Sequence, residues 1–333
     1  MKFLVIQTAF PGDVILASAV VEKLHEFYPK GKIDFLLRKG NEGIFTAHPF
    51  LNKIFIWDKK KSKTSEIFLI LGEVRREKYD YVINLHRFAS SGFITAFSGA
   101  ENKIGFDKNP FSFLFTEKYE HTIGNGVHET ERNHKLIAKL TGGKSSKPKL
   151  YPSDKDFQKI SEYKAGKYVC IAPASVWFTK QWSTHKWAEL IKLIPEEQNI
   201  YLLGAPSDSN LCEEIKLAVT SSVVEKRIIN LSGKLSFLES ASLMKDATMN
   251  YVNDSAPLHL ASAVNAPVTA VFCSTVPEFG FGPLSDNSFI AQTKENLSCR
   301  PCGLHGKSSC PEKHFKCSGT IKAEDVFSLS LTK

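Results

Sequence analysis

The acidic residue Asp13 lies where a parallel α/β protein usually presents its backbone to a phosphate. The apolar run 2–6 is typical of a strand buried on both faces. The segment FPGDVILASAV (10–20) follows it, with apolar residues at helical spacing from Val14 onward. A carboxylate beside Gly12 at such a strand-to-helix turn would repel a phosphate rather than bind it. Asp13 therefore needs another chemical role.

A second strand-to-helix turn, NDSAPLH (253–259), has the features of an anion site. Ser255 and Ala256 are small, so the N–H groups of the first helical turn can approach an anion closely. His259 lies one turn further along the same helix. The alternative is a purely structural turn, in which Asp254 caps the helix and His259 packs against its inner face.

Two further strand ends carry polar groups. Lys180 stands between aromatic residues in APASVWFTKQW (172–182), and can reach a pyrophosphate as a point charge or simply lie on the surface. Asp208 follows a glycine turn in LLGAPSD (202–208), where it is a candidate acceptor for a ribose hydroxyl. The sequence has no G-x-G-x-x-G after the first strand, no P-loop and no H-E-x-x-H, which argues against dehydrogenase, P-loop ATPase and zincin functions.

Strand-like and helix-like segments alternate twice along the chain, which predicts an α/β fold with two doubly wound parallel sheets. The polar segment 142–166 is the best candidate for a linker. We expect an N-terminal domain over 1–155 and a C-terminal domain over 166–320, with residues 321–333 packing back on the first domain. Ligands of such sheets bind beyond the carboxyl ends of the strands, so a cleft between the two domains is the expected site.

The composition indicates a water-soluble protein with an anionic partner. The 333 residues carry a formal net charge of +8, and 42% of them are hydrophobic. A surplus of lysine on a solvated surface would produce the same charge. The apolar start is interrupted at residues 11–13, unlike a signal peptide, and no run is long enough to span a membrane. We therefore expect a cytoplasmic protein whose seven cysteines are mostly reduced.

The segment 299–317 concentrates four of these cysteines with two histidines. Its C-x-x-C pair suggests a zinc site, but six residues separate Cys310 from Cys317, which is not a standard zinc-ribbon spacing. Free thiols in a loop near the cleft, a structural metal held by Cys299, Cys302, Cys310 and Cys317, and, less readily in the cytoplasm, a disulfide all remain open.

Across nearly its full length the chain resembles glycosyltransferase family 9, the ADP-heptose:lipopolysaccharide heptosyltransferases. The resemblance rests on an ordered set of segments: PGDVILASAVVEKL (11–24), HETERN (128–133), K-Q-W…HKWAEL (180–190), LLGAPSD (202–208), LSGKLSFLE (231–239) and NDSAPLHLASAV (253–264). The last segment matches the pattern N-D-[ST]-G-x-x-H-x-A-x-A, with Ala256 in place of glycine.

The resemblance implies a GT-B fold, with two Rossmann-like domains facing a central cleft. It implies inverting, metal-independent transfer of heptose from ADP-heptose to the lipopolysaccharide inner core, with no cofactor. Asp13 then corresponds to the general base, and Lys180 to the phosphate-binding lysine that assists departure of ADP. The donor-binding residues that follow from it are Ser175, Lys180, Asp208, Asp254, Ser255, Ala256 and His259. Pro206 and Ser207 stand where the family often has glutamate, so ribose recognition departs from its pattern.

The acceptor implied by the resemblance is acidic and is attached to the inner membrane, so the enzyme would sit at that membrane peripherally. The acceptor-binding residues are expected to be Gly12, Arg87 and Arg132, with Arg132 contacting a carboxylate bidentately. KKKSK (59–63) is expected to be a solvated loop that faces the membrane. The alternatives are a GT-B enzyme with another donor or acceptor, and a glycan-binding protein without catalysis. Nucleic acid is not expected, because the basic residues are spread and form no recognised motif.

Overall fold

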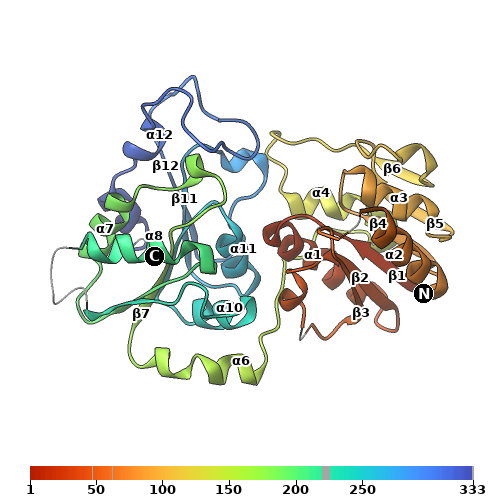
Figure 1. Ribbon diagram of the computed structural model, residues 1–333, viewed down its shortest axis with the longest axis horizontal. Coiled ribbons are helices and arrows are strands. Elements are labelled where there is room, and N and C mark those ends of the chain that lie inside the picture. Colours follow the sequence, from red (N-terminus) through yellow and green to blue (C-terminus); the bar gives the residue numbers. More distant parts are fainter. Residues whose placement is uncertain (47, 62, 220–225, 332–333) are drawn as a thin grey trace. The chain divides into compact units, whose positions relative to one another are not determined.

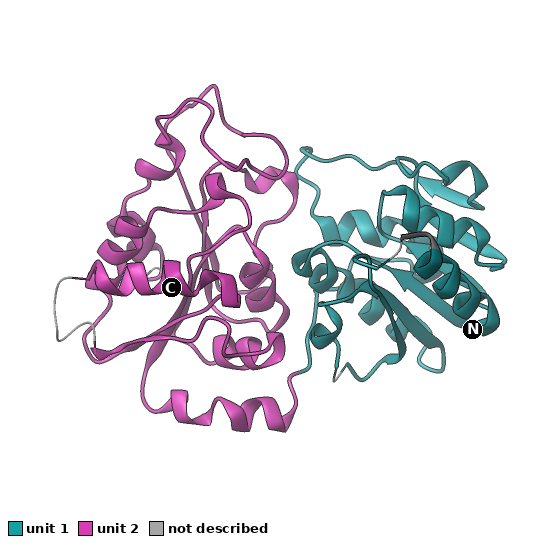
Figure 2. Cartoon of the chain, in the orientation of Figure 1, with its two compact units in different colours: residues 1–151 teal, residues 152–333 magenta. Residues whose placement is uncertain are grey.

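The computed structural model describes residues 1–46, 48–61, 63–219 and 226–331. The chain divides into two compact units, Met1–Tyr151 and Pro152–Lys333 (Figure 2). The division falls within the polar segment 142–166. Among the described residues, no helix has both the length and the apolar character that crossing a bilayer requires.

Unit 1 is built on a six-stranded sheet in the order β3-β2-β1-β4-β5-β6, with every neighbouring pair parallel. Its strands are β1 (Lys2–Ile6), β2 (Lys32–Arg38), β3 (Leu51–Trp57), β4 (Tyr81–Asn84), β5 (Asn102–Phe106) and β6 (Glu117–Tyr119). Its helices are α1 (Pro11–Phe27), α2 (Lys63–Glu77), α3 (Ala89–Phe97), α4 (Glu129–Lys135) and α5 (Ala138–Thr141). Helix α1 packs against α4 and α5, and α2 packs against α3.

Unit 2 repeats the plan, with six parallel strands in the order β12-β11-β10-β7-β8-β9. Its strands are β7 (Tyr168–Ala172), β8 (Asn199–Leu202), β9 (Ile228–Asn230), β10 (Met249–Asn253), β11 (Val268–Phe272) and β12 (Ser288–Gln292). Its helices are α6 (Asp154–Lys159), α7 (Thr184–Leu193), α8 (Ser209–Leu217), α10 (Phe237–Lys245), α11 (Ala256–Ala263), α12 (Lys316–Gly319) and α13 (Ala323–Leu329). Figure 1 shows α7 and α8 on one side of this sheet, and α10 and α11 on the other.

Both strand orders are that of a Rossmann-like sheet, read from opposite edges. The order reverses between β1 and β4 in unit 1, and between β7 and β10 in unit 2. These two switch points leave a crevice at the carboxyl ends of the strands, where open α/β sheets bind ligands. Asp13 follows β1, and Lys180 and Asp254 follow β7 and β10, so the chain order alone brings the candidate residues to the two switch points.

The segment between the units is partly ordered into helix. Residues 154–159 form α6, which begins with a capping box between Ser153 and Asp156 and packs against α10 of unit 2. The preceding residues pack on unit 1, where the Lys149 backbone N–H donates to Ser18 (2.9 Å) and the Tyr151 hydroxyl donates to Glu22 (2.9 Å). The connecting segment therefore contacts unit 1 at its start and unit 2 through α6.

The expectation that the C-terminal tail packs on the first domain is wrong for its described residues. Ile321, Ala323 and Val326 are buried in the hydrophobic core of unit 2, and α13 packs against α7 and β12. The Tyr251 hydroxyl of β10 also donates to Ser330 at 2.9 Å. These three apolar residues therefore pack α13 into the helical layer that covers the sheet of unit 2.

Candidate functional site

Asp13 lies in the first turn of α1 at the switch point of unit 1, and is partly exposed. The chain turns at Phe10, which has extended backbone angles, and Pro11 supplies the first helical residue. Proline suits that position because its fixed φ fits the helix and its missing N–H needs no partner. Gly12 is already helical, so the chain turns at Phe10 and Pro11 and not at the glycine.

A second carboxylate, Glu129, lies close to Asp13 because α4 packs against α1. Glu129 is the first residue of α4, is 5% exposed, and accepts hydrogen bonds from Arg132 Nε (2.8 Å) and from Arg132 Nη2 (2.7 Å). Burial, reinforced by the negative charge of Asp13, raises the pKa of Glu129 to about 7, although Arg132 and Arg87 oppose the shift. Asp13 and Glu129 therefore form a pair of interacting acids.

Arg132 occupies a different environment from the one expected. Its side chain is 2% exposed, and besides Glu129 it donates to the carbonyl of Val127. The Arg132 guanidinium is buried and hydrogen-bonded to Glu129. The geometry therefore does not support direct contact between Arg132 and an acceptor carboxylate. Arg132 instead fixes Glu129 beside Asp13.

The same edge of the sheet carries a group of cations around Thr8, two residues after the end of β1. Lys59 Nζ donates to the Thr8 carbonyl (2.9 Å) and hydroxyl (3.0 Å), and lies 4.9 Å from the Trp57 ring centre. Arg38, the last residue of β2, stacks over the Phe10 ring at 4.9 Å. Burial, with a smaller contribution from Arg38, lowers the pKa of Lys59 to about 8.

The expectation that KKKSK (59–63) is a solvated loop is wrong for its first residue. Lys59 is half-buried and belongs to the strand-end site, whereas Lys60 and Lys61 are exposed. Ser62 lies outside the described residues, and so does the side chain of Lys63. Lys59 differs from the rest of the run because it lies only two residues after the end of β3.

His86 and Arg87 complete this edge, because both follow β4. The His86 ring Nδ1 lies 3.2 Å from the Thr8 hydroxyl. Burial, with smaller contributions from the charges of Lys59 and Arg87, lowers the pKa of His86 to about 3, so the ring is neutral at physiological pH. Arg87 is partly exposed, as an acceptor-binding residue has to be. Sequence reasoning missed Glu129 and His86; the strand-end position of His86 was the available signal.

In unit 2 the structure brings Lys180 and Asp254 together. Lys180 Nζ lies 2.7 Å from Asp254 Oδ2, with the two side chains only 15% and 7% exposed. The Thr275 hydroxyl donates to the same carboxylate oxygen at 2.6 Å. Asp254 directly follows β10 and Thr275 follows β11, so three neighbouring strand ends contribute to one polar cluster.

Buried side chains position the loop that carries Lys180. The Trp182 backbone N–H donates to Asn253 Oδ1 at 3.1 Å, and Asn253 Nδ2 donates to the Pro173 carbonyl. Trp182 is buried and packs edge-on against Trp187 of α7, with ring centres 4.9 Å apart. The loop is thus tied to the end of β10, which explains how a flexible lysine reaches Asp254.

Helix α11 begins beside this pair, with Ser255 as its N-cap and Ala256 as its first residue. The Ser255 side chain does not cap the helix. The Asp254 carboxylate forms the ion pair with Lys180 and accepts the hydrogen bond from Thr275. The interpretation of Asp254 as a helix cap is therefore wrong. His259 is buried on the same helix, with its ring centre 6.4 Å from that of Phe281.

Two expected donor residues have local roles. Asp208 Oδ2 accepts from the Ala205 backbone N–H at 2.8 Å, and so closes the turn after β8. The carbonyl of Ser175 accepts from Gln181 Nε2 at 2.7 Å, which stabilises the loop before Lys180. Both residues are partly exposed at strand ends of unit 2.

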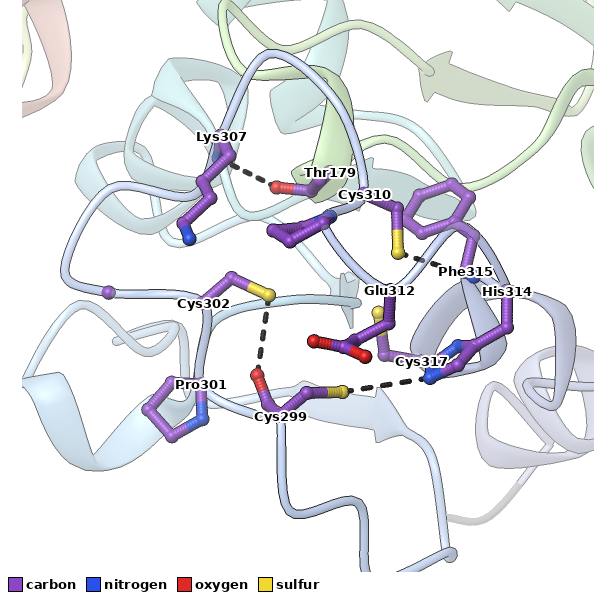
Figure 3. Close-up of a pocket in the computed structure, with 12 residues that line it drawn as sticks. Thr179, Cys299, Pro301, Cys302, Lys307, Cys310, Glu312, His314, Phe315 and Cys317 are labelled. Atoms are coloured by element: carbon purple, nitrogen blue, oxygen red, sulfur yellow. Dashed lines mark hydrogen bonds between the residues drawn. The ribbon is translucent and has the colours of Figure 1, made fainter.

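The cysteine-rich segment folds over the end of β11. The Cys302 backbone N–H donates to the Ser274 carbonyl (2.9 Å), and Arg300 donates to the carbonyls of Cys273 (2.7 Å) and Thr275 (2.7 Å). Residues 299–317 enclose a cavity of about 240 Å³ that is drawn in Figure 3. As the chain stands, no three histidine, cysteine, aspartate or glutamate side chains among the described residues are placed to hold a metal ion.

Solved structures share this architecture. The structure of E. coli ADP-heptose lipopolysaccharide heptosyltransferase II aligns with 99% of this chain and 99% of its own, with a TM-score of 0.82 and 20% identity. E. coli heptosyltransferase WaaC with ADP aligns with 98% of both chains, with a TM-score of 0.73 and 18% identity. The two Rossmann-like units thus have the GT-B fold.

The chain belongs to glycosyltransferase family 9 (heptosyltransferase), whose family model matches residues 69–313. Lipopolysaccharide heptosyltransferase 3 of E. coli is 28% identical over 84% of this chain and 85% of its own. Lipopolysaccharide heptosyltransferase 1 of Campylobacter coli is 24% identical over 99% of this chain and 98% of its own. The family predicted from the sequence segments is confirmed.

Proposed function

We propose that this enzyme transfers heptose from ADP-heptose to an acidic saccharide of the lipopolysaccharide inner core, with inversion at the anomeric carbon and without a metal ion in the reaction. The names of its relatives support the sugar and the acceptor class. The observation that carries the proposal is the chemical contrast of the two strand-end sites. Unit 1 offers a pair of acids, and unit 2 offers a lysine beside a helix N-terminus.

In the proposed mechanism Asp13 is the general base. The acceptor hydroxyl oxygen attacks the anomeric carbon of heptose while its proton passes to the Asp13 carboxylate. The bond from that carbon to the diphosphate oxygen breaks in the same step, so a single displacement inverts the configuration. A helix N-terminus stabilises the carboxylate and weakens it as a base. The nearby charge of Glu129 opposes this effect, because two like charges take up a proton more readily than one.

In unit 2 the leaving diphosphate is the group to stabilise. Lys180 provides a positive charge, and the backbone N–H groups of Ser255 and Ala256 stand at the start of α11, next in the chain to the Asp254 that holds Lys180. Asp254 holds Lys180 through Oδ2 and contacts the donor sugar, and His259 assists from the next helical turn. The lysine and the amides supply the charge stabilisation that the departing ADP needs. Ser175 and Asp208 line the nucleoside side of this donor site.

The acceptor's acidic groups bind at the cation group of unit 1. Lys59, Arg38 and Arg87 lie at the ends of β3, β2 and β4, with β1 between β2 and β4, and Phe10 and Phe88 add exposed rings. A carboxylate or phosphate on the acceptor would be attracted by all three cations, and a sugar ring would stack on the aromatic side chains. This group takes over the role that the sequence suggested for Arg132.

We also propose that the enzyme works in the cytoplasm at the inner membrane surface. The exposed Lys60 and Lys61 would contact anionic lipid, at about 1 kcal/mol per charge. Replacing both by glutamine should raise KM for a membrane-bound acceptor and leave KM for a soluble fragment unchanged. Equal effects on the two acceptors would show that these lysines bind the saccharide instead.

The test of the function is ADP release from ADP-heptose, measured with and without a core acceptor, and with UDP- and GDP-sugars as alternative donors. Release that requires both ADP-heptose and acceptor supports the proposal, and NMR of the product's anomeric centre reports inversion. Activity with another donor alone would assign the chain to a different GT-B reaction. Acceptor binding without turnover would indicate a glycan-binding protein.

A further inference from the structure

The cysteine-rich segment is an unusual piece of chain. Residues 293–315, between β12 and α12, contain neither helix nor strand. Loops of that length in compact domains are uncommon unless they are functional or are held by something beyond backbone pairing. Lys313 and Phe315 also have left-handed backbone angles, which non-glycine residues adopt only when the surroundings hold them there. The loop therefore needs a local constraint.

Four thiols converge inside this loop. Cys299, Cys302, Cys310 and Cys317 all line the same cavity, and their side chains surround it in Figure 3. Cys317 lies within electrostatic range of the other three thiols. The thiols are not paired as disulfides in the structure. Four cysteine sulfurs around one small cavity match the donor set of a tetrahedral zinc or iron centre.

His314 also reaches the cavity, but its hydrogen bonds give it another role. Its Nε2 lies 3.9 Å from Cys299 Sγ, and its Nδ1 accepts the Lys316 backbone N–H at 3.0 Å. A neutral ring that accepts at Nδ1 carries its proton on Nε2. That nitrogen is then a donor toward the Cys299 sulfur and not a metal ligand.

Positive and N–H groups lie beside the sulfurs. Arg300 is within electrostatic range of Cys317 and Lys307 of Cys302, and the Phe315 backbone N–H donates to Cys310 Sγ at 3.4 Å. Glu312 opposes them, but it is exposed, so its side chain is free to move into solvent. Such cationic and N–H neighbours are the usual outer contacts of metal-bound thiolates.

We propose that Cys299, Cys302, Cys310 and Cys317 bind one divalent, thiolate-preferring metal ion, zinc or iron(II), in a structural tetrahedral site. Binding draws the four sulfurs together by side-chain rotation, and each thiol releases its proton to solvent. The oxidation state of the metal does not change. The site is separate from the sugar-transfer reaction and does not depend on the proposed function.

The site would stabilise the loop that carries Lys180. Thr179, the residue before it, donates its backbone N–H to the Lys307 carbonyl (3.1 Å) and accepts the Lys307 backbone N–H at its hydroxyl (2.8 Å). Ser274 donates to the same hydroxyl at 3.0 Å. The backbone between Cys302 and Cys310 is thus attached directly to the base of the donor site, so a metal that fixes this backbone also fixes Thr179.

The experiment uses the full chain, purified under reducing conditions, stripped with a chelator and then incubated separately with Zn²⁺ or, without oxygen, with Fe²⁺. Bound metal is measured by elemental analysis after gel filtration, and accessible thiols by alkylation and intact mass. We expect one equivalent of one of the two metals, and protection of four thiols from alkylation. Uptake of neither metal by the wild-type chain would overturn the proposal.

Variants assign the ligands. Cys302→Ser and Cys310→Ser should each lose the bound metal, whereas Cys212→Ala, a buried cysteine in the core of unit 2, should retain it. His314→Ala should also retain one equivalent, because the histidine is assigned as a donor to Cys299; loss of the metal in that variant would refute the four-thiolate assignment. Wild-type alkylation with and without metal gives the same answer if a cysteine variant fails to fold. Unchanged labelling would then contradict the proposal.

Discussion

The two switch points have the same strand order and opposite chemistry. In unit 2 a lysine and an aspartate neutralise each other at 2.7 Å beside the start of a helix. In unit 1 two carboxylates lie close together, and a separate group of cations surrounds the end of β1. The ion pair fixes the Lys180 ammonium, whose remaining N–H groups can donate to a diphosphate while Asp254 keeps its contact. A pair of like charges instead favours proton uptake, so the proposed mechanism assigns donor binding to one unit and proton transfer to the other.

The strongest test of this contrast removes the base and leaves the donor site intact. Asp13→Asn should reduce kcat by about 10²- to 10⁴-fold, the range that a general base contributes. The Kd for ADP should stay unchanged, because the residue belongs to the other unit. Steady-state kinetics and calorimetric titration measure the two values. Retention of more than about a tenth of the wild-type rate would remove Asp13 from that role.

Glu129→Gln tests whether the two acids are coupled. The pKa of Glu129 is raised from its ordinary value of 4.5 to about 7, so between those pH values the folded protein binds more protons than the unfolded chain. Its contribution to stability is therefore full below about pH 4.5, and is lost as the pH rises through 7. The free energy of unfolding of the wild type should fall by up to about 3 kcal/mol more than that of the variant over this window.

The same variant should change catalysis. Wild-type kcat should rise with pH through about 7 as Glu129 ionises beside Asp13, and the profile of Glu129→Gln should be flat there. Denaturant titrations and pH–rate profiles of both proteins provide the data. A variant with the wild-type inflection in both measurements would show that the two carboxylates act independently.

Lys180→Ala tests the neutralised pair of unit 2. Loss of one charge-assisted contact to the diphosphate, worth about 1.5–3 kcal/mol, should lower kcat/KM for the donor about 10- to 100-fold and leave the acceptor KM unchanged. Lys186→Ala is the matched control, because Lys186 pairs with Glu189 on α7 and not with Asp254. Equal donor kinetics in the two variants would place the diphosphate elsewhere.

The smallest effect is expected at the cation group of unit 1. The pKa of Lys59 is lowered to about 8, so its charge is present below that pH and lost above it. KM for an acidic acceptor should rise roughly tenfold as the pH passes through 8, on the order of one charged hydrogen bond. Lys59→Arg should remove this rise, because arginine stays protonated, and Lys59→Ala should have the higher KM throughout. A pH-independent wild-type KM would exclude Lys59 from acceptor binding.

Much of the fold could be predicted from local patterns. Buried parallel strands such as β1 and β10 are nearly continuous apolar runs, and the helices between them repeat apolar residues at helical spacing. Short or half-exposed elements such as β6, β12 and α4 were missed, because three to seven residues with mixed polarity carry little periodic signal. The tail 321–333 was misplaced because an apolar stripe does not specify which sheet it covers.

The sequence by itself determined the family, the alternation of most strands and helices along the chain and the candidate residues at the strand ends, since each depends on local spacing and segment order. Only the tertiary structure decided which charges meet. Lys180 and Asp254 are far apart in the chain, and so are Asp13 and Glu129; their pairing depends on how α4 packs against α1 and how Asn253 anchors the Lys180 loop. From the sequence, buried Arg132 and half-buried Lys59 look like any surface cation. Their burial and their partners set their pKa values and the contacts they can make. Both arise from packing between segments that are distant in the chain.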